Sequence, residues 1–221
     1  DASSRTKVFL PNGVYDLGKT TEQQLPIDKL SLIGQNTDST IIVTAPDASI
    51  EGLGKADLFL NTKKDLYLQD LTLKNALDYY GAGVAGRAAV WQDRGDRTIF
   101  RNVKMLSYQD TYYSQNNAMQ SYFEDCAIHG TVDFICGGGD VRFQHTTLSL
   151  EPRNAKGEGG RTITAPTTTT NYGYVFDDCS IVDLTKGKGD WNYGRTWQEK
   201  PICVFLNTTL DDNAAATIVS S

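Results

Sequence analysis

The sequence predicts a single all-β domain built as a parallel β-helix, in which the chain coils into stacked rungs. Two observations lead to this fold class. A six-residue template with apolar residues at its first, usually its fourth, and its sixth place recurs along the chain. Short β-rich runs alternate with Gly, Asn, Asp and Thr, and no stretch keeps apolar residues at helical spacing over several turns. Both features are typical of a solenoid of strands.

The template occurs in six copies, which begin 32, 23, 20, 33 and 29 residues apart. In chain order they cover residues 68–73, 100–105, 123–128, 143–148, 176–181 and 205–210. The intervals indicate a minimal rung of about 20 residues with insertions that leave from one face. We therefore expect like side chains to stack inside the coil. One predicted ladder holds Phe100, Phe123, Phe143, Phe176 and Phe205, and a second holds Val103, Cys126 and Cys179.

Composition sets limits on function. The net charge of -6 and the pI near 4.9 argue against a nucleic-acid partner, because phosphate binding needs clustered Lys and Arg. No apolar run reaches membrane-spanning length, and we find no linker that would divide the chain. Cys126 and Cys179 occupy the same template place and are expected to be buried thiols.

Two aspartates carry the chemical prediction. Asp110 and Asp133 each lie ten residues after a template phenylalanine, Phe100 and Phe123. If each copy marks one rung, the carboxylates are about 5 Å apart, the spacing of adjacent strands. The charge of one acid then pushes its neighbour toward the protonated form. A neutral acid beside an ionised carboxylate is a general acid beside a nucleophile or base.

Other catalytic arrangements fit the chain less well. Its two histidines, His129 and His145, lie outside any Gly-x-Ser-x-Gly nucleophile motif, which disfavours a Ser-His-Asp triad. An arbitrary Asp in a β-helix turn usually bonds its own backbone. We expect Asp78, also ten residues after its template residue Leu68, to be such a turn residue.

Four motifs in order carry a family resemblance. They are Gly-Asp-Arg at 95–97, Tyr-Gln-Asp-Thr-Tyr-Tyr at 108–113, Gly-Thr-Val-Asp-Phe-Ile-Cys-Gly at 130–137, and Tyr-Gly-Arg-Thr-Trp at 193–197. Together they resemble the pectin methylesterases, and the likeness spans nearly the whole chain. The resemblance implies a right-handed parallel β-helix that hydrolyses galacturonate methyl esters in plant-wall pectin, with no metal or organic cofactor. We expect residues 1–221 to form one such domain that lacks terminal parts of the full family domain.

The resemblance also implies partners and residue roles. The expected partner is methyl-esterified homogalacturonan, with no nucleic acid or membrane, and the expected form is a secreted or periplasmic monomer. Asp133 would be the nucleophile and Asp110 the acid and then the base. Arg195 would pair with Asp133, and Gln109 would donate an N–H to the oxyanion. The residues expected to contact the sugar chain are Trp197, Phe134, Tyr113 and Arg87.

Arg87 is the main departure from the family pattern, which has Gln there as a second oxyanion donor. Arg87 either replaces that amide with a charged donor, or leaves the oxyanion hole impaired and lowers the pKa of Asp110. Thr196 replaces a family Pro, and Cys136 and Gly138 replace Phe and Asn beside the second aspartate. Two alternatives stay open, and Arg87 and the expected lack of terminal parts support the first of them. One is a catalytically silent β-helix that binds wall polysaccharide, and the other is a related ester or thioester hydrolase.

Overall fold

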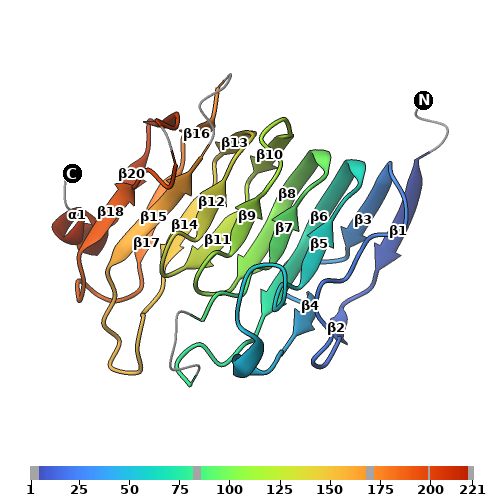
Figure 1. The fold of residues 1–221 in the computed structure, drawn as a ribbon, viewed down its shortest axis with the longest axis horizontal. Helices are drawn as coiled ribbons and strands as arrows, with labels where there is room; N and C mark the ends of the chain where they lie inside the picture. Colours follow the sequence, from blue (N-terminus) through green and yellow to red (C-terminus); the bar gives the residue numbers. More distant parts are fainter. Residues whose placement is uncertain (1–4, 82–85, 168–171, 199, 219–221) are drawn as a thin grey trace.

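The predicted parallel β-helix is confirmed. In this computed structural model, which describes residues 5–81, 86–167, 172–198 and 200–218, successive strands stack side by side along the longest axis. The N-terminus lies at one end of the stack and the C-terminus at the other (Figure 1). Within the described residues, the strands of both sheets pair in parallel, as a coil of rungs requires.

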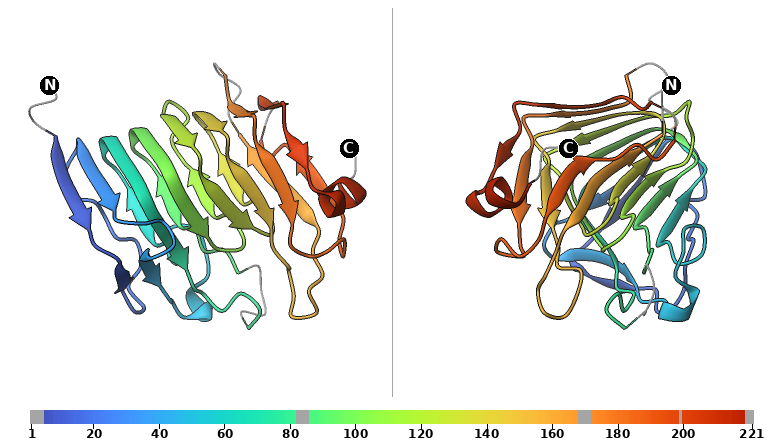
Figure 2. Two further views of the ribbon diagram at one scale, coloured as in Figure 1. Left: turned by 180° about the vertical axis from the view of Figure 1, so that it is seen from behind. Right: turned by 60° about the vertical axis from the view of Figure 1, so that its left-hand side comes forward.

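The coil has three walls, which the turned views show curling around a common interior (Figure 2). The first wall contains β1 Thr6–Leu10, β3 Leu30–Gly34, β10 Gln120–Glu124, β13 Asp140–Gln144, β16 Tyr174–Asp177 and β19 Cys203–Leu206. The second contains β2 Gly13–Asp16, β4 Thr40–Thr44, β11 Ala127–Gly130, β14 Thr147–Leu150, β17 Ser180–Asp183 and β20 Thr209–Leu210. Two long strands, β6 Lys64–Asn75 and β8 Asp96–Leu106, run through both walls. The third wall is a separate sheet of β5 Phe59–Asn61, β7 Trp91–Asp93, β9 Tyr112–Ser114, β12 Ile135–Gly137, β15 Arg161–Pro166 and β18 Trp191–Gly194.

Helical structure is confined to two short pieces in the described residues, the 3₁₀ turn η2 Ala48–Ile50 and α1 Asp212–Thr217. The Asp211 side chain caps α1 by accepting from the Ala214 N–H. Within the described ranges, no helix is long and apolar enough to cross a membrane.

The corner between the first two walls explains the third place of the template. That place is held by Asp70, Asn102, Asp125, His145, Asp178 and Asn207, and all six have φ between 49° and 54°. Among non-glycine residues, Asn, Asp and His adopt this left-handed conformation most readily. The polar third place therefore sets the bend, while the apolar places on either side face the interior.

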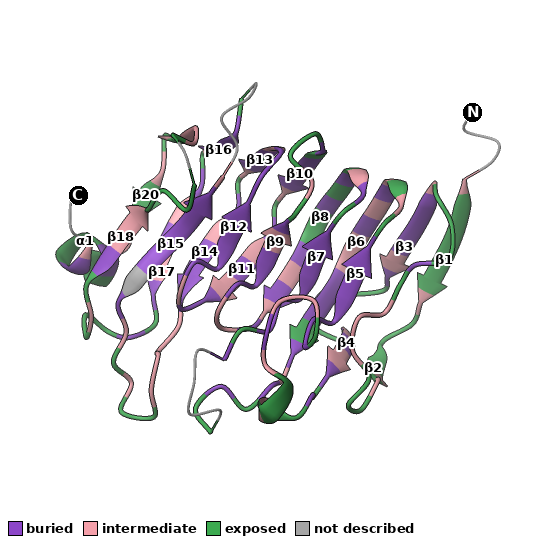
Figure 3. Cartoon of the chain, viewed as in Figure 1, coloured by how far each residue is buried: buried purple, intermediate pink, exposed green. Residues whose placement is uncertain are grey.

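The predicted phenylalanine ladder fills that interior. Ring centroids lie 4.5 Å apart for Phe100–Phe123, 4.7 Å for Phe123–Phe143, and 4.4 Å for both Phe143–Phe176 and Phe176–Phe205. These pairs are stacked, and buried residues occur along the strands of all three walls (Figure 3). The second predicted ladder is also buried, with Val103, Cys126 and Cys179 at most 4% exposed. Both cysteines are free thiols.

Candidate active site

The two predicted aspartates lie on neighbouring rungs of the third wall. Asp110 precedes β9 by two residues and Asp133 precedes β12 by two, and these strands pair with Tyr112 opposite Ile135. The Asp110 N–H donates to the Val132 carbonyl at 3.1 Å, which joins the two turns directly. Both residues have a left-handed backbone, with φ of 59° and 48°, and both are under 8% exposed. Such strained, buried carboxylates are concentrated at functional sites.

Asp110 is built to hold a proton at neutral pH. Burial raises the pKa of its carboxyl to about 8, the negative charge of Asp133 adds to the rise, and Arg87 opposes it. The Cys136 thiol donates a hydrogen bond to Asp110 Oδ1, with 3.9 Å between the sulfur and the oxygen. Burial, reinforced by the charge of Asp110, raises the pKa of Cys136 well above its ordinary value, so this thiol remains protonated. Asp110 therefore has the protonation state of a general acid.

Asp133 is held by the arginine that the sequence indicated. Arg195 follows β18, where its N–H donates to the Thr164 carbonyl at 3.0 Å. Its Nε donates to Asp133 Oδ1 at 3.0 Å and Oδ2 at 3.2 Å, and its Nη2 donates to Oδ2 at 2.5 Å. These bonds raise the pKa of Arg195. A planar guanidinium that bonds both oxygens fixes the orientation of the carboxylate as well as its charge partner.

Arg87 is bound by a residue that sequence reasoning missed. Glu51 accepts from Arg87 Nε at 3.0 Å, from Nη2 at 2.9 Å, and from the Arg87 backbone N–H at 2.9 Å. The hydrogen bond with Arg87 lowers the pKa of Glu51. The Arg87 backbone pairs with Gln109, so the ion pair stands one rung from the Asp110 turn. Two guanidinium nitrogens of Arg87 therefore bond Glu51. Among the described residues, no hydrogen bond joins the Arg87 side chain to Asp110 or Asp133.

The predicted aromatic residues divide into two groups. Tyr113 and Trp197 lie together, with ring centroids 5.9 Å apart, and Trp197 is 37% exposed. Beside Arg195, a cavity of about 240 Å³ is lined by Thr164, Tyr193 and Cys203 among others. Tyr113 belongs to β9, the strand that follows the Asp110 turn, whereas Trp197 follows β18, two strands beyond β12 in the third wall.

Phe134 does not line the cleft, and that expectation is wrong. Its side chain is completely buried and belongs to the hydrophobic core. The side chain of Asp133 is turned toward Arg195, whereas the next side chain turns inward, over Gly130. A Cβ at position 130 would lie 2.1 Å from the Phe134 Cβ, so glycine makes room for the ring. Phe134 supports the turn from inside.

Asp57 is a further buried carboxyl that sequence reasoning missed. β5 pairs with β7 and β7 with β9, so Asp57, two residues before β5, occupies the same place as Asp110 two rungs away. It accepts from the N–H groups of Gly54 and Ala89, at 2.9 and 3.3 Å. Burial raises its pKa to about 7. No template copy precedes Asp57, so the ten-residue offset could not identify it. Its position two residues before a strand is the feature that it shares with Asp110 and Asp133.

Other polar groups are less suited to chemistry. The Asp78 side chain accepts from the Gly81 N–H at 3.0 Å and is exposed, which confirms the predicted turn residue. His129 contacts Glu151 at 2.7 Å on another wall. Among the described residues, no group of three or more His, Cys, Asp and Glu is arranged to hold a metal ion.

Comparisons with known proteins agree on one family. A family profile described as Pectinesterase matches residues 1–217. Probable pectinesterase 50 of Arabidopsis thaliana is 28% identical over 211 residues, which are 94% of this chain and 55% of the relative. The chain spans about half the length, or less, of the curated relatives it matches first.

Solved structures show the same fold. The pectin methylesterase from carrot matches with a TM-score of 0.82 and 22% identity, covering 99% of this chain and 69% of the other. A pectin methylesterase in complex with a hexasaccharide matches with a TM-score of 0.81 and 24% identity, covering 98% and 72%.

Proposed function

The chain belongs to the pectinesterase family, and on this premise we propose that it hydrolyses galacturonate methyl esters in pectin, releasing methanol and a free carboxylate. One observation carries the proposal. A carboxyl that keeps its proton, Asp110, stands one rung from a carboxylate that an arginine orients, Asp133. That pair supplies an acid and a nucleophile without any further group.

The proposed reaction uses the pair twice. An Asp133 oxygen attacks the ester carbonyl carbon, and the Gln109 amide N–H bonds the oxygen that becomes negative. As the carbon–methoxy bond breaks, Asp110 gives its proton to the leaving oxygen and methanol departs. Asp133 is then bound to the sugar as an anhydride. Asp110, now ionised, takes a proton from water, whose oxygen attacks the same carbon and releases Asp133.

The surrounding residues have supporting roles in this proposal. Arg195 holds the Asp133 carboxylate in one orientation between turnovers. Tyr113 and Trp197 offer an apolar surface on which a sugar ring packs. We also propose that the protein acts outside the cytoplasm as a monomer on homogalacturonan, because the polymer lies in the wall. Sedimentation at a mass above one chain would count against the monomer.

Methanol release from methyl-esterified galacturonan tests the function. The wild-type protein should release methanol, and Asp133→Asn should reduce the rate by at least about a thousandfold, because the covalent nucleophile is lost. Asp78→Asn is the matched control, since Asp78 has the same template offset but is an exposed turn residue. A folded Asp133→Asn protein with near-normal methanol release would show that Asp133 is not the nucleophile.

A silent polysaccharide-binding β-helix is the second candidate. It is favoured by the engagement of Arg87 with Glu51, which leaves Gln109 as the one side chain that we assign to the oxyanion. Such a protein would retain the polymer and release no methanol. A related hydrolase would instead release product from other esters or thioesters, so a substrate panel separates the three outcomes.

A further inference from the structure

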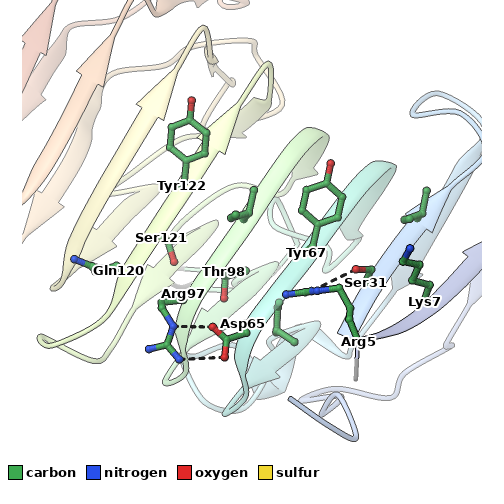
Figure 4. A pocket seen from close by; sticks show the side chains of 13 residues that line it. Arg5, Lys7, Ser31, Asp65, Tyr67, Arg97, Thr98, Gln120, Ser121 and Tyr122 are labelled. Carbon is green, nitrogen blue, oxygen red and sulfur yellow. Dashed lines mark hydrogen bonds and ion pairs between the residues drawn. The ribbon is translucent and has the colours of Figure 1, made fainter. Parts of the chain in front are cut away.

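A second groove lies on the first wall, whereas the aspartates precede strands of the third. It has a volume of about 650 Å³ and lies over β1, β3, β6, β8 and β10 (Figure 4). We call it the outer groove. The residues that line it include Arg5, Lys7, Ser31, Tyr67, Arg97, Ile99 and Tyr122.

The floor of the outer groove is one continuous row across five strands. Register places Lys7 beside Ser31, Ser31 beside Tyr67, Tyr67 beside Ile99, and Ile99 beside Tyr122. In β6, β8 and β10 the next residue along, at positions 68, 100 and 123, is a buried core residue, so the row faces outward. Tyr67 and Tyr122 project from the same face of the sheet in Figure 4.

The centre of the row is apolar and aromatic. Ile99 is 41% exposed, and the two tyrosines that flank it are partly exposed. The Tyr67 hydroxyl is within 2.6 Å of Gln69 Oε1, which anchors that side chain. Tyr67 and Tyr122 are two rungs apart, about 10 Å, a distance that spans more than one ring of a linked sugar chain. A groove of about 650 Å³ that is apolar at its centre and polar at its rim has the size and chemistry of a ligand-binding site.

The charges at one end of the groove favour an anionic ligand. Arg5 donates to the Leu30 carbonyl and to Ser31 Oγ, at 3.4 and 3.3 Å, both neutral acceptors. Within the described residues, neither Arg5 nor Lys7 forms an ion pair with a carboxylate. These two cations therefore lie together on a chain whose net charge is -6.

Arg97 is different, because it bonds both oxygens of Asp65 and also contacts Asp96. The hydrogen bonds from Arg97 lower the pKa of Asp65, and the charge of Arg5 lowers it further. The Arg97 charge is thus compensated inside the protein. The cationic end of the outer groove is set by Arg5 and Lys7.

We propose that the outer groove binds a galacturonan chain at a site separate from the catalytic one. The tyrosine and isoleucine row packs against the sugar rings, while Arg5 and Lys7 bind carboxylates along the chain. The choice of this polymer rests on the proposed function. A sugar acid that has lost its methyl ester presents the carboxylate these cations require, so the groove retains the de-esterified product and holds the enzyme on its polymer.

Titration with fully de-esterified oligogalacturonate tests the outer groove, because this ligand releases no methanol. The wild-type protein should show two sites per chain, and Tyr67→Ala with Tyr122→Ala should remove one of them or weaken it at least about tenfold. Tyr172→Ala is the matched control, since Tyr172 is 74% exposed and does not line the groove. Unchanged binding by the folded double variant would overturn the proposal.

The cations give an independent variant that leaves the apolar floor intact. Lys7→Gln should weaken the outer site at low salt and less at high salt, because screening already suppresses the interaction there. Lys19→Gln is its control, since Lys19 pairs with Asp47 outside the groove. Equal effects of the two substitutions would argue against the groove.

Two further measurements separate the possible failures. Methanol release from a short esterified oligomer should be unchanged in the tyrosine double variant. If the wild-type protein releases no methanol, the proposed function fails, whatever the titration shows. If wild-type chains sediment as a dimer and the double variant as a monomer, the groove joins two copies of the chain, and the polysaccharide proposal is wrong.

Discussion

Arg87→Gln should shift the basic limb of the pH–rate profile upward. Asp110 serves as the acid only while protonated, and its pKa, raised by burial to about 8, is held down by the Arg87 charge. Replacing Arg87 with a neutral amide removes that opposing effect. It also leaves Glu51 with an unpaired negative charge in a side chain that is only 13% exposed. Both consequences favour the protonated form of Asp110.

The size of the shift follows from the rung spacing. The Arg87 backbone pairs with Gln109, so we place its charge about 8 Å from Asp110, between one and two rung spacings. Two unit charges at that distance interact by about 0.5 kcal/mol in water and about 2 kcal/mol at an effective dielectric constant of 20. The Arg87 side chain is 45% exposed, which favours the lower figure, an upward shift of about 0.4 pKa unit.

Two partner variants make the test sharper. Glu51→Gln leaves the arginine cation unbalanced near Asp110, so the basic limb should move downward. The double variant Glu51→Gln with Arg87→Gln holds a neutral pair and should return the limb close to its wild-type position. The assay is kcat/KM for methanol release from methyl-esterified galacturonan between pH 5 and about 10, which brackets the raised pKa of Asp110.

The outcomes discriminate between the two roles that the sequence left open. If Arg87→Gln lowers the plateau by a factor of at least about 100 and leaves the limb in place, Arg87 donates to the oxyanion. If both single variants move the limb in the same direction, the electrostatic account of the Glu51–Arg87 pair is refuted.

Three further predictions concern the pair and the core. Arg195→Lys should lose activity although the charge is kept, because an ammonium cannot bond both carboxylate oxygens as a guanidinium does. The loss of activity should not add to the loss caused by Asp133→Asn, because each substitution disrupts the same ion pair. Additive losses in methanol release would show that the two residues act separately. Asp110→Asn should stabilise the protein by at least about 1.4 kcal/mol at pH 8 and by nothing near pH 3. The reason is that the wild-type protein loses stability as pH rises from the ordinary carboxyl range to the raised pKa of about 8; urea unfolding with the same gain at both pH values would contradict this. Phe143→Ala should cost about 3 to 5 kcal/mol by thermal or urea unfolding, since it opens a cavity in a fully buried stack; a cost below about 1 kcal/mol would show that the ladder repacks.

The six-residue template was enough to predict the interior and the position of the aspartates. Because the side chains at its first place repeat once per rung, the phenylalanine stack follows from the spacing alone. The equal offset of Asp110 and Asp133 from Phe100 and Phe123 then puts the two carboxylates on adjacent rungs. The spacing of the repeated template was therefore sufficient to predict that Asp110 and Asp133 lie on adjacent rungs.

Contacts outside the repeat could not be predicted in this way. Glu51 reaches Arg87 from a turn 36 residues away, in a segment before the first template copy. Insertions of variable length have no common register, so the sequence does not show which of their side chains meet. The error at Phe134 has another cause. A motif shows which residues occur together, but not which of two neighbours faces the interior.

The template also contains a signal that points to the outer face. In a strand, the residue immediately before a buried one faces the opposite side. The residues directly before the first template place are Tyr67, Ile99, Tyr122, Arg142, Val175 and Val204. Pairing in the first wall places these six side by side, in this order. The aromatic and apolar members at 67, 99 and 122 form the floor of the outer groove, and Arg142 follows at the next rung. The repeated template therefore specifies two rows of side chains. Its first place forms the packed core, and the residue directly before that place forms the row proposed to bind the sugar chain.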